Sequence, residues 1–172
     1  MDFVKQIQIS EKFQGIYLTE FSLIDKLEQD EHLIINKFLK SNSFSYDCLP
    51  EIVKQSNVKS DYYLRQLFDT DKISFEDFRK LNKKEISNFF INYSNESDWG
   101  DDRKEFKTLL EKFISLLHEY PSDKFYLISQ DWFDIDSKKM RNPENWIYTY
   151  YFLVIWFDRE KKTMIVCDWN YD

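Results

Sequence analysis

The chain has 172 residues, a length typical of one domain, because a single core usually holds about 100–200 residues. Hydrophobic residues make up 42% of the chain and charged residues 32%, so it can bury a core and is not mainly disordered. The formal charge of -7 disfavours adhesion to a phosphate backbone. Gly15 and Gly100 are the only glycines, which excludes nucleotide cofactors held by a glycine-rich loop.

The first part of the chain contains one predicted strand and several predicted helices. Residues 15–21 alternate between apolar and polar side chains, which indicates a strand. Residues 25–40, 50–56 and 61–68 have apolar positions spaced as on one face of a helix. We therefore expect helices to dominate after the first strand.

Two longer helices are predicted in the middle of the chain. Ser74 offers a hydroxyl N-cap with Asp77 three positions later, which predicts a helix over about 75–92. Between residues 101 and 120 apolar side chains recur every three or four positions, the strongest helical pattern in the chain. Asp102 falls in the first turn of this helix, where the macrodipole favours negative charge.

After Pro121 the hydrophobic pattern changes to a period of two. Residues 125–133, 147–157 and 163–169 are predicted strands because they are rich in β-branched and aromatic side chains. The strand 147–157 is apolar on both faces, which predicts a central strand that forms a hairpin with 163–169. Polar side chains make the closing strand resemble an edge strand, and these are Asp168, Asn170 and Asp172.

Together these elements predict an α+β fold. We expect one domain over residues 1–172, in which a helical N-terminal two thirds packs against an antiparallel sheet. The helix-rich part covers residues 20–120, and the sheet forms mainly from the C-terminal third, which is strand-rich over 124–170. The longest apolar stretch is too short to cross a bilayer and no signal peptide is recognisable, so we expect a cytoplasmic protein.

Candidate catalytic and metal-binding residues are few. The cysteines and histidines lack the close spacing of zinc ligands, and these are His32, Cys48, His118 and Cys167. We expect no metal, no cofactor and no nucleophile pair, and therefore a binding protein rather than an enzyme. A cluster of acidic residues is a polar loop, a hard-cation site or a docking point for a cationic partner, and it comprises Asp131, Asp134 and Asp136.

Residues 47–90 contain a partial motif. It resembles one helix-turn-helix of the AraC/XylS transcription regulators in the residues Ile52, Asn57, Tyr63, Leu64 and Phe68. The resemblance implies a DNA-binding regulator that uses a helix-turn-helix at about 50–68. We keep this as the alternative function, because the segment has as many acidic as basic residues and phosphates would repel its aspartates.

The overall profile of the chain is similar to that of bacterial immunity proteins, such as those that neutralise toxins of contact-dependent growth inhibition. The resemblance is one of class, and it implies a non-enzymatic protein that binds a cognate, basic, nucleic-acid-acting toxin, and binds neither nucleic acid nor membrane. In such interfaces carboxylates speed association and aromatic rings anchor the complex. The acidic and aromatic residues predicted to contact the toxin are Asp98, Trp99, Asp101, Asp102, Asp131, Trp132, Asp134, Asp136 and Trp146.

Overall fold

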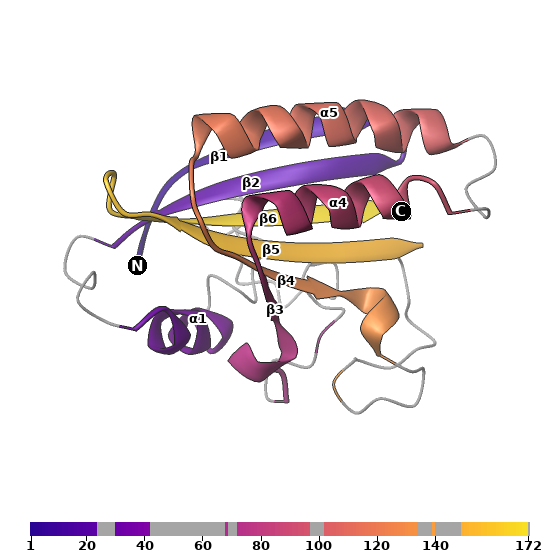
Figure 1. The fold of residues 1–172 in the computed structure, drawn as a ribbon. Coiled ribbons are helices and arrows are strands. Elements are labelled where there is room, and N and C mark those ends of the chain that lie inside the picture. The colour runs from indigo at the N-terminus through magenta and orange to yellow at the C-terminus, as the bar shows by residue number, and fades with distance from the viewer. Residues whose placement is uncertain are drawn as a thin grey trace, which may run out of the picture.

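The structure is a computed structural model that describes residues 1–23, 30–41, 68, 72–96, 102–133, 139 and 149–171. Its centre is a six-stranded antiparallel sheet with the strand order β1-β2-β6-β5-β4-β3 (Figure 1). The strands are β1 (Asp2–Glu11), β2 (Gln14–Ser22), β3 (Arg79–Leu81), β4 (Phe125–Ser129), β5 (Tyr150–Asp158) and β6 (Thr163–Tyr171).

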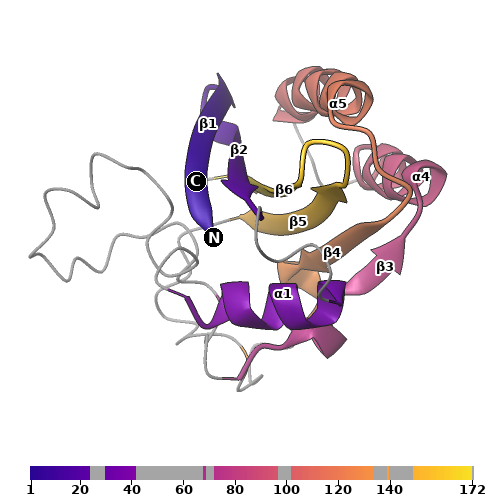
Figure 2. The same cartoon turned by 90° about the vertical axis from the view of Figure 1, so that its left-hand side faces the viewer.

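Helices cover both faces of this sheet. Helices α4 and α5 lie side by side over one face, and α1 lies across the other, as the two views in Figures 1 and 2 agree. The α-helices are α1 (Glu31–Leu39), α4 (Lys83–Tyr93) and α5 (Arg103–Glu119), and the short 3-10 helices are η2 (Phe75–Asp77) and η4 (Gln130–Trp132).

Two hairpins form the larger part of the sheet. The β1–β2 hairpin closes through a two-residue turn in which Lys12 has a positive φ of 50°, a conformation that tight hairpin turns require. The β5–β6 hairpin closes through the polar residues 159–162. Strands β2 and β6 then pair antiparallel along their whole length, from Gln14 opposite Tyr171 to Ser22 opposite Thr163. The N-terminal and C-terminal hairpins thus form one continuous sheet.

Strand β5 separates two hydrophobic cores. All nine of its residues are buried, and successive side chains point to opposite faces because a strand has a period of two. Leu153 and Ile155 pack with α1, whereas Val154 and Trp156 pack with α4 and α5. The prediction of a central strand that is apolar on both faces and pairs with the closing strand is confirmed, over Tyr150–Asp158.

Helices α4 and α5 pack on the core that contains Val154 and Trp156, which we call the second core. Their sequences explain where α4 begins and which face of α5 is buried. The side chain of Asn82 accepts hydrogen bonds from the backbone N–H groups of Lys84 and Glu85, at 2.9 and 3.0 Å, and so caps α4. Helix α5 buries the apolar stripe that the sequence predicted. Its buried residues are Phe106, Leu109, Leu110, Phe113, Leu116 and Leu117.

The expected distribution of helices and strands is wrong, although the class α+β is correct. The first two thirds of the chain are not mainly helical, because β1, β2 and β3 all lie there, and the sheet does not form mainly from the C-terminal third. Strand β1 shows the alternation that predicts a strand, with Ile7 and Ile9 between polar neighbours. Its pairing with β2 closes a hairpin whose apolar face supports α5.

The helix predicted over 75–92 is divided in the structure. Ser74 and Asp77 do form a capping box, but it caps only the three residues of η2. Residues Arg79–Leu81 then extend and pair with β4, and α4 starts only after Asn82. Similarly, the strand predicted over 125–133 ends at Ser129, where η4 begins. A capping box marks a helix start but does not determine how far the helix continues.

Strand β6 is not an edge strand. It lies between β2 and β5, and Asp168 and Asn170 are buried. The Tyr151 hydroxyl on β5 donates a hydrogen bond to the Asp168 carboxylate, so a polar side chain is accommodated inside the sheet. The helices predicted over 50–56 and 61–68, and with them the helix-turn-helix-like segment, lie outside the described residues except for Phe68, which is fully buried.

Candidate functional site

A pocket of about 410 Å³ opens at the end of the sheet where β5 begins and β6 ends. We call it the acidic pocket. Carboxylates and tyrosines dominate its lining, which consists of Tyr93, Glu96, Asp102, Asp131, Thr149, Tyr150 and Tyr171. Among the described residues no lysine or arginine lines it. The pocket therefore combines negative charge with aromatic surface.

Asp102 is held in the pocket lining by contacts with two strands, β2 and β6. It directly precedes α5, and its carboxylate accepts a hydrogen bond from the hydroxyl of Tyr171 on β6. Its backbone carbonyl accepts a hydrogen bond of 3.1 Å from Gln14 Nε2 on β2, and Gln14 Oε1 accepts one of 2.7 Å from the Tyr150 hydroxyl on β5. The hydrogen bond to the Asp102 carboxylate, together with burial, raises the pKa of Tyr171, which keeps that hydroxyl protonated.

Asp131 lines the same pocket from a different part of the chain. It lies in η4, directly after β4, and its backbone N–H donates to Ser129 Oγ at 3.3 Å. Partial desolvation raises the pKa of the Asp131 carboxyl, and a hydrogen bond with Tyr93 partly offsets this effect. Burial and the nearby Asp131 charge likewise raise the pKa of Tyr93, so this hydroxyl is a hydrogen-bond donor at neutral pH. As a whole residue, Asp131 remains exposed to solvent.

Tyrosine rings give the pocket a rigid wall. The Tyr93 ring meets Phe152 edge to face at 4.8 Å between centroids and Tyr150 at 5.9 Å. Tyr150 in turn contacts Tyr171 at 5.7 Å. Edge-to-face pairs of this kind hold aromatic side chains in one orientation. The hydroxyls of the wall are therefore presented in fixed positions.

The structure brings together two of the residues predicted to contact a partner. Asp102 and Asp131 belong to segments far apart in sequence, yet both line the acidic pocket. Trp132 does not line this pocket: it is partly buried and packs against both cores, with the Arg79 guanidinium 3.7 Å from its ring centroid and the Phe89 ring centroid 6.0 Å away. The remaining predicted residues lie outside the described part of the chain, and these are Asp98, Trp99, Asp101, Asp134, Asp136 and Trp146.

Sequence reasoning missed the tyrosines and Glu96. Tyr150 and Tyr171 stand at the two ends of a hairpin, and their neighbourhood follows only from the register that places them opposite each other. Tyr93 is the last residue of α4, and it lies just beyond the helix predicted over 75–92. A hairpin pairing model built from the two predicted strands could have placed Tyr150 beside Tyr171, but not Tyr93.

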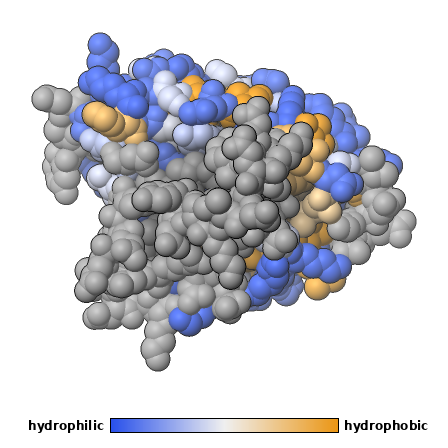
Figure 3. Space-filling view, turned by 180° about the vertical axis from the view of Figure 1, so that it is seen from behind, coloured by the Kyte–Doolittle hydropathy of each residue, from blue (hydrophilic) through white to orange (hydrophobic). Residues whose placement is uncertain are grey.

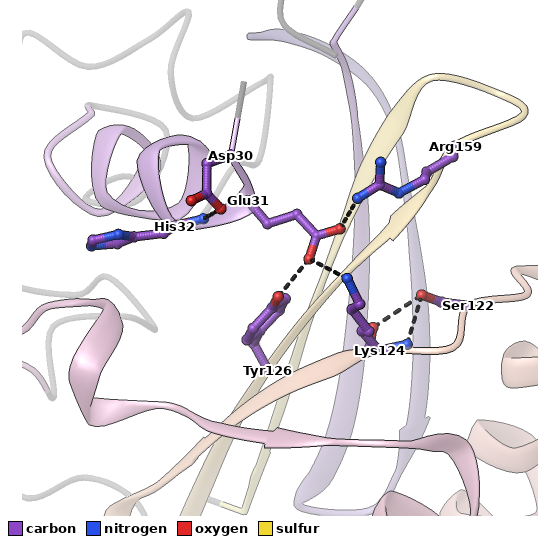
Figure 4. A network of polar contacts seen from close by, with 7 residues as sticks. All are labelled: Asp30, Glu31, His32, Ser122, Lys124, Tyr126 and Arg159. Atoms are coloured by element: carbon purple, nitrogen blue, oxygen red, sulfur yellow. Dashed lines mark hydrogen bonds and ion pairs between the residues drawn. The ribbon is translucent and has the colours of Figure 1, made fainter. Parts of the chain in front are cut away.

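A second polar cluster surrounds Glu31, the first residue of α1 (Figure 4). Its carboxylate accepts hydrogen bonds from the Tyr126 hydroxyl and the Arg159 guanidinium, and Lys124 Nζ lies 3.7 Å away. We call these four residues the Glu31 network. Burial raises the pKa of Glu31, but these hydrogen bonds and cations outweigh it, and the pKa lies below its ordinary value.

The Glu31 network is better suited to stability than to ligand binding. The Glu31 side chain is only 11% exposed, and both of its oxygens are engaged by donors from β4 and the β5–β6 turn. The adjacent pocket of about 580 Å³ has side chains of both charge signs, including Lys83 and Glu160. Its charges compensate one another, so the acidic pocket is the stronger candidate for binding.

The histidines and cysteines do not form a reactive pair in the part of the chain that the structure describes. His32 Nε2 lies 3.3 Å from Glu76, and His118 Nδ1 lies 3.2 Å from Lys83 Nζ. Cys167 is buried in β6, and Cys48 lies outside the described residues. Within those residues no group of three potential ligands could hold a metal ion, and no helix is both long and apolar enough to span a membrane.

Comparison with known proteins gives no relative for this chain. No protein-family model, no curated protein sequence and no solved structure matches it. Its function is therefore inferred from the geometry and charge described above.

Proposed function

We propose that this chain is a non-enzymatic immunity or inhibitor protein of the bacterial cytoplasm that binds and neutralises a cognate basic toxin, one that acts on nucleic acid. The acidic pocket is the proposed docking site. The observation that carries the proposal is the convergence of Asp102 and Asp131, from distant segments, in one tyrosine-lined pocket. Both residues are among the acidic residues that the sequence predicted to contact the toxin.

The chemistry of the pocket suits a lysine or arginine side chain of the partner. Asp102 and Asp131 accept hydrogen bonds from neutral tyrosine hydroxyls, and within the described residues no ion pair neutralises either carboxylate. A cationic group that enters the pocket gains a charge-assisted hydrogen bond, which is about twice as strong as a neutral one. The surrounding tyrosine rings add cation–π attraction and exclude water.

The charge of the whole chain supports the same partner. With a formal charge of -7, the protein attracts a basic surface over several ångströms before contact. Toxins that act on nucleic acid present basic clefts to phosphates, so an acidic inhibitor associates rapidly with them. Tyrosine is enriched at binding hot spots because it buries a large area and keeps one hydrogen-bonding group.

The test compares two matched charge variants in partner capture and in the association and dissociation rates of the captured partner. The parent, the Asp102→Asn/Asp131→Asn variant and the control Asp123→Asn/Glu160→Gln are used to capture partners, which are identified by mass spectrometry. Both control residues are exposed and lie near the β5–β6 turn, at the opposite end of the sheet from the pocket. Association and dissociation rates of the identified partner are then measured at two salt concentrations.

The proposal predicts that the association rate and the lifetime of the complex depend on different residues. The pocket variant should associate about tenfold more slowly and with a flatter salt dependence, because steering depends on surface charge. Tyr171→Ala should shorten the lifetime of the complex. If the ring is a hot spot, its loss weakens the binding free energy by about 2 kcal/mol. The control should match the parent. Equal association rates for both charge variants, or capture of nucleic acid in place of a basic protein, would reject the proposal.

A further inference from the structure

The turn between β1 and β2 lies at the same end of the sheet as the acidic pocket. Gln14, the first residue of β2, stands opposite Tyr171 on β6. Its side chain donates a hydrogen bond of 3.1 Å to the Asp102 carbonyl and accepts one of 2.7 Å from the Tyr150 hydroxyl. These three neighbours of Gln14 all line the pocket. The turn directly before Gln14 therefore lies next to the pocket lining.

Three of the four residues at this turn are tied to α5 or to the backbone directly before it. Lys12 forms an ion pair with Glu105 of α5, and Lys112 Nζ of α5 lies 2.6 Å from Glu11. Gln14 donates its hydrogen bond to the carbonyl group that precedes α5. Lys12 has a φ of 50°, which is uncommon for residues other than glycine, and its ion pair helps to hold this conformation. The turn is thus held in one position on α5.

Phe13 is the one residue of the turn that extends into solvent. At 67% exposure, it is the most exposed of the five large hydrophobic residues on the described surface. The described surface seen from behind is mostly hydrophilic, with hydrophobic residues in small patches (Figure 3). A single exposed apolar side chain is ordinary, but this ring stands on an anchored turn beside a charged pocket. A ring held in this way loses little conformational freedom when a partner covers it.

We propose that Phe13 and the acidic pocket form one docking surface for the partner. The pocket takes a lysine or arginine side chain, and the Phe13 ring packs against an aliphatic side chain that neighbours this cation in the partner. The inference rests on the proposed function, because it takes the pocket as the site of the partner's cationic group. It adds a second requirement, an apolar group beside the cation.

The charges around the turn agree with such a partner. Among the described residues that line the pocket there are carboxylates but no lysine or arginine, so the pocket is where a cation is attracted. The ammonium groups of Lys12 and Lys112 at the turn are paired with the carboxylates of Glu105 and Glu11, so they repel an approaching basic partner only weakly. The turn then offers its apolar ring. A partner that lacks either the cation or the aliphatic group binds less tightly.

Two defined peptides test the docking surface directly. The parent chain is titrated with acetyl-Leu-Arg-Leu-amide and with acetyl-Ser-Arg-Ser-amide, and NMR follows the backbone amide of Gln14. The leucine peptide should bind about threefold or more tightly, because its side chains remove part of the Phe13 ring from water. Phe13→Ser should bind both peptides equally, whereas Asp102→Asn/Asp131→Asn should weaken both. Leu33→Ser is the matched control, since Leu33 is 50% exposed on α1, across the other face of the sheet, and it should behave as the parent.

Kinetics with the basic protein captured by the parent chain give the second test. Phe13→Ser should dissociate from that protein about tenfold faster, with unchanged association rate and melting temperature, because an apolar contact acts after docking. Leu33→Ser should dissociate at the parent's rate.

The outcomes separate this inference from the proposed function. A captured partner that needs the pocket carboxylates but leaves Phe13→Ser at the parent's dissociation rate overturns the inference and leaves the proposed function intact. A leucine preference that depends on Phe13, in the absence of any captured basic protein, supports the docking surface and rejects the proposed function. A parent chain that does not distinguish the two peptides, or a preference that survives in Phe13→Ser, overturns the inference.

Discussion

Replacing Trp169 by leucine should expose how strongly the second core depends on β6. The Trp169 side chain is fully buried, and its ring stacks on Phe90 and on Phe106, each at 4.6 Å between centroids. The ring of Phe113 lies 5.5 Å away. Trp169 thus joins β6 to both α4 and α5, and its removal affects three elements at once.

The magnitude follows from the packing that the indole ring provides. Truncation of a buried tryptophan to alanine costs about 3–5 kcal/mol, and each stacked aromatic pair contributes about 0.5–1.5 kcal/mol beyond its area. Leucine keeps part of the buried volume but forms neither stacked pair. We expect the free energy of unfolding to fall by about 3 kcal/mol, and the melting temperature by roughly 6–12 °C for a chain of this size.

Urea unfolding followed by fluorescence and by circular dichroism measures this decrease in stability. Phe13→Leu is the matched control, because Phe13 is 67% exposed in the β1–β2 turn and its change should stay within about 0.5 kcal/mol. A decrease below about 1 kcal/mol for Trp169→Leu would mean that the ring is not enclosed. The position of β6 between β2 and β5 would then be refuted.

Three further changes test charges and hydroxyls inside the structure. Partial desolvation raises the pKa of Asp131, so stability falls as pH rises through the folded pKa; Asp131→Asn should be more stable than the parent by up to about 1 kcal/mol at pH 7 and equal to it in strong acid, as melting against pH would show. Glu31 has a lowered pKa, so its stabilisation is present above the unfolded pKa and is lost as pH falls through the folded one. Glu31→Gln should therefore cost about 2 kcal/mol at pH 7 and much less near pH 3 in urea titrations. Tyr151→Phe removes a donor from the fully buried Asp168 carboxylate and should cost about 2 kcal/mol by the same assay, and an unchanged midpoint would show that this hydrogen bond does not contribute.

The elements that could be predicted are those whose sequence pattern is local. The three-to-four spacing of apolar residues specified the buried stripe of α5, and the two-sided apolar run specified β5 as a central strand. Strand β2 was also predicted, over 15–21 against Gln14–Ser22 in the structure. In each case the sequence pattern lies within one helix face or one strand, so no distant partner is needed to recognise it.

The elements that could not be predicted depend on distant partners. Asp168 suggested an edge strand because its donor, Tyr151, becomes its neighbour only through hairpin pairing. Likewise Arg79–Leu81 is extended because β4 accepts it as a neighbour, despite the helical signal around it. The acidic pocket follows the same rule: Asp102 and Asp131 were chosen one at a time, and the sheet topology brought them together.

The pairing of β2 with β6 determines when the protein can fold during synthesis. Gln14 meets Tyr171 and Ser22 meets Thr163, so this pairing joins the first hairpin of the described sheet to the strand that comes last in its chain order. Until residues 163–171 leave the ribosome, the inner edges of both β2 and β5 lack their partner. Contacts of such long sequence separation slow folding. A nascent chain stopped before residue 163 therefore exposes apolar strands to chaperones and proteases.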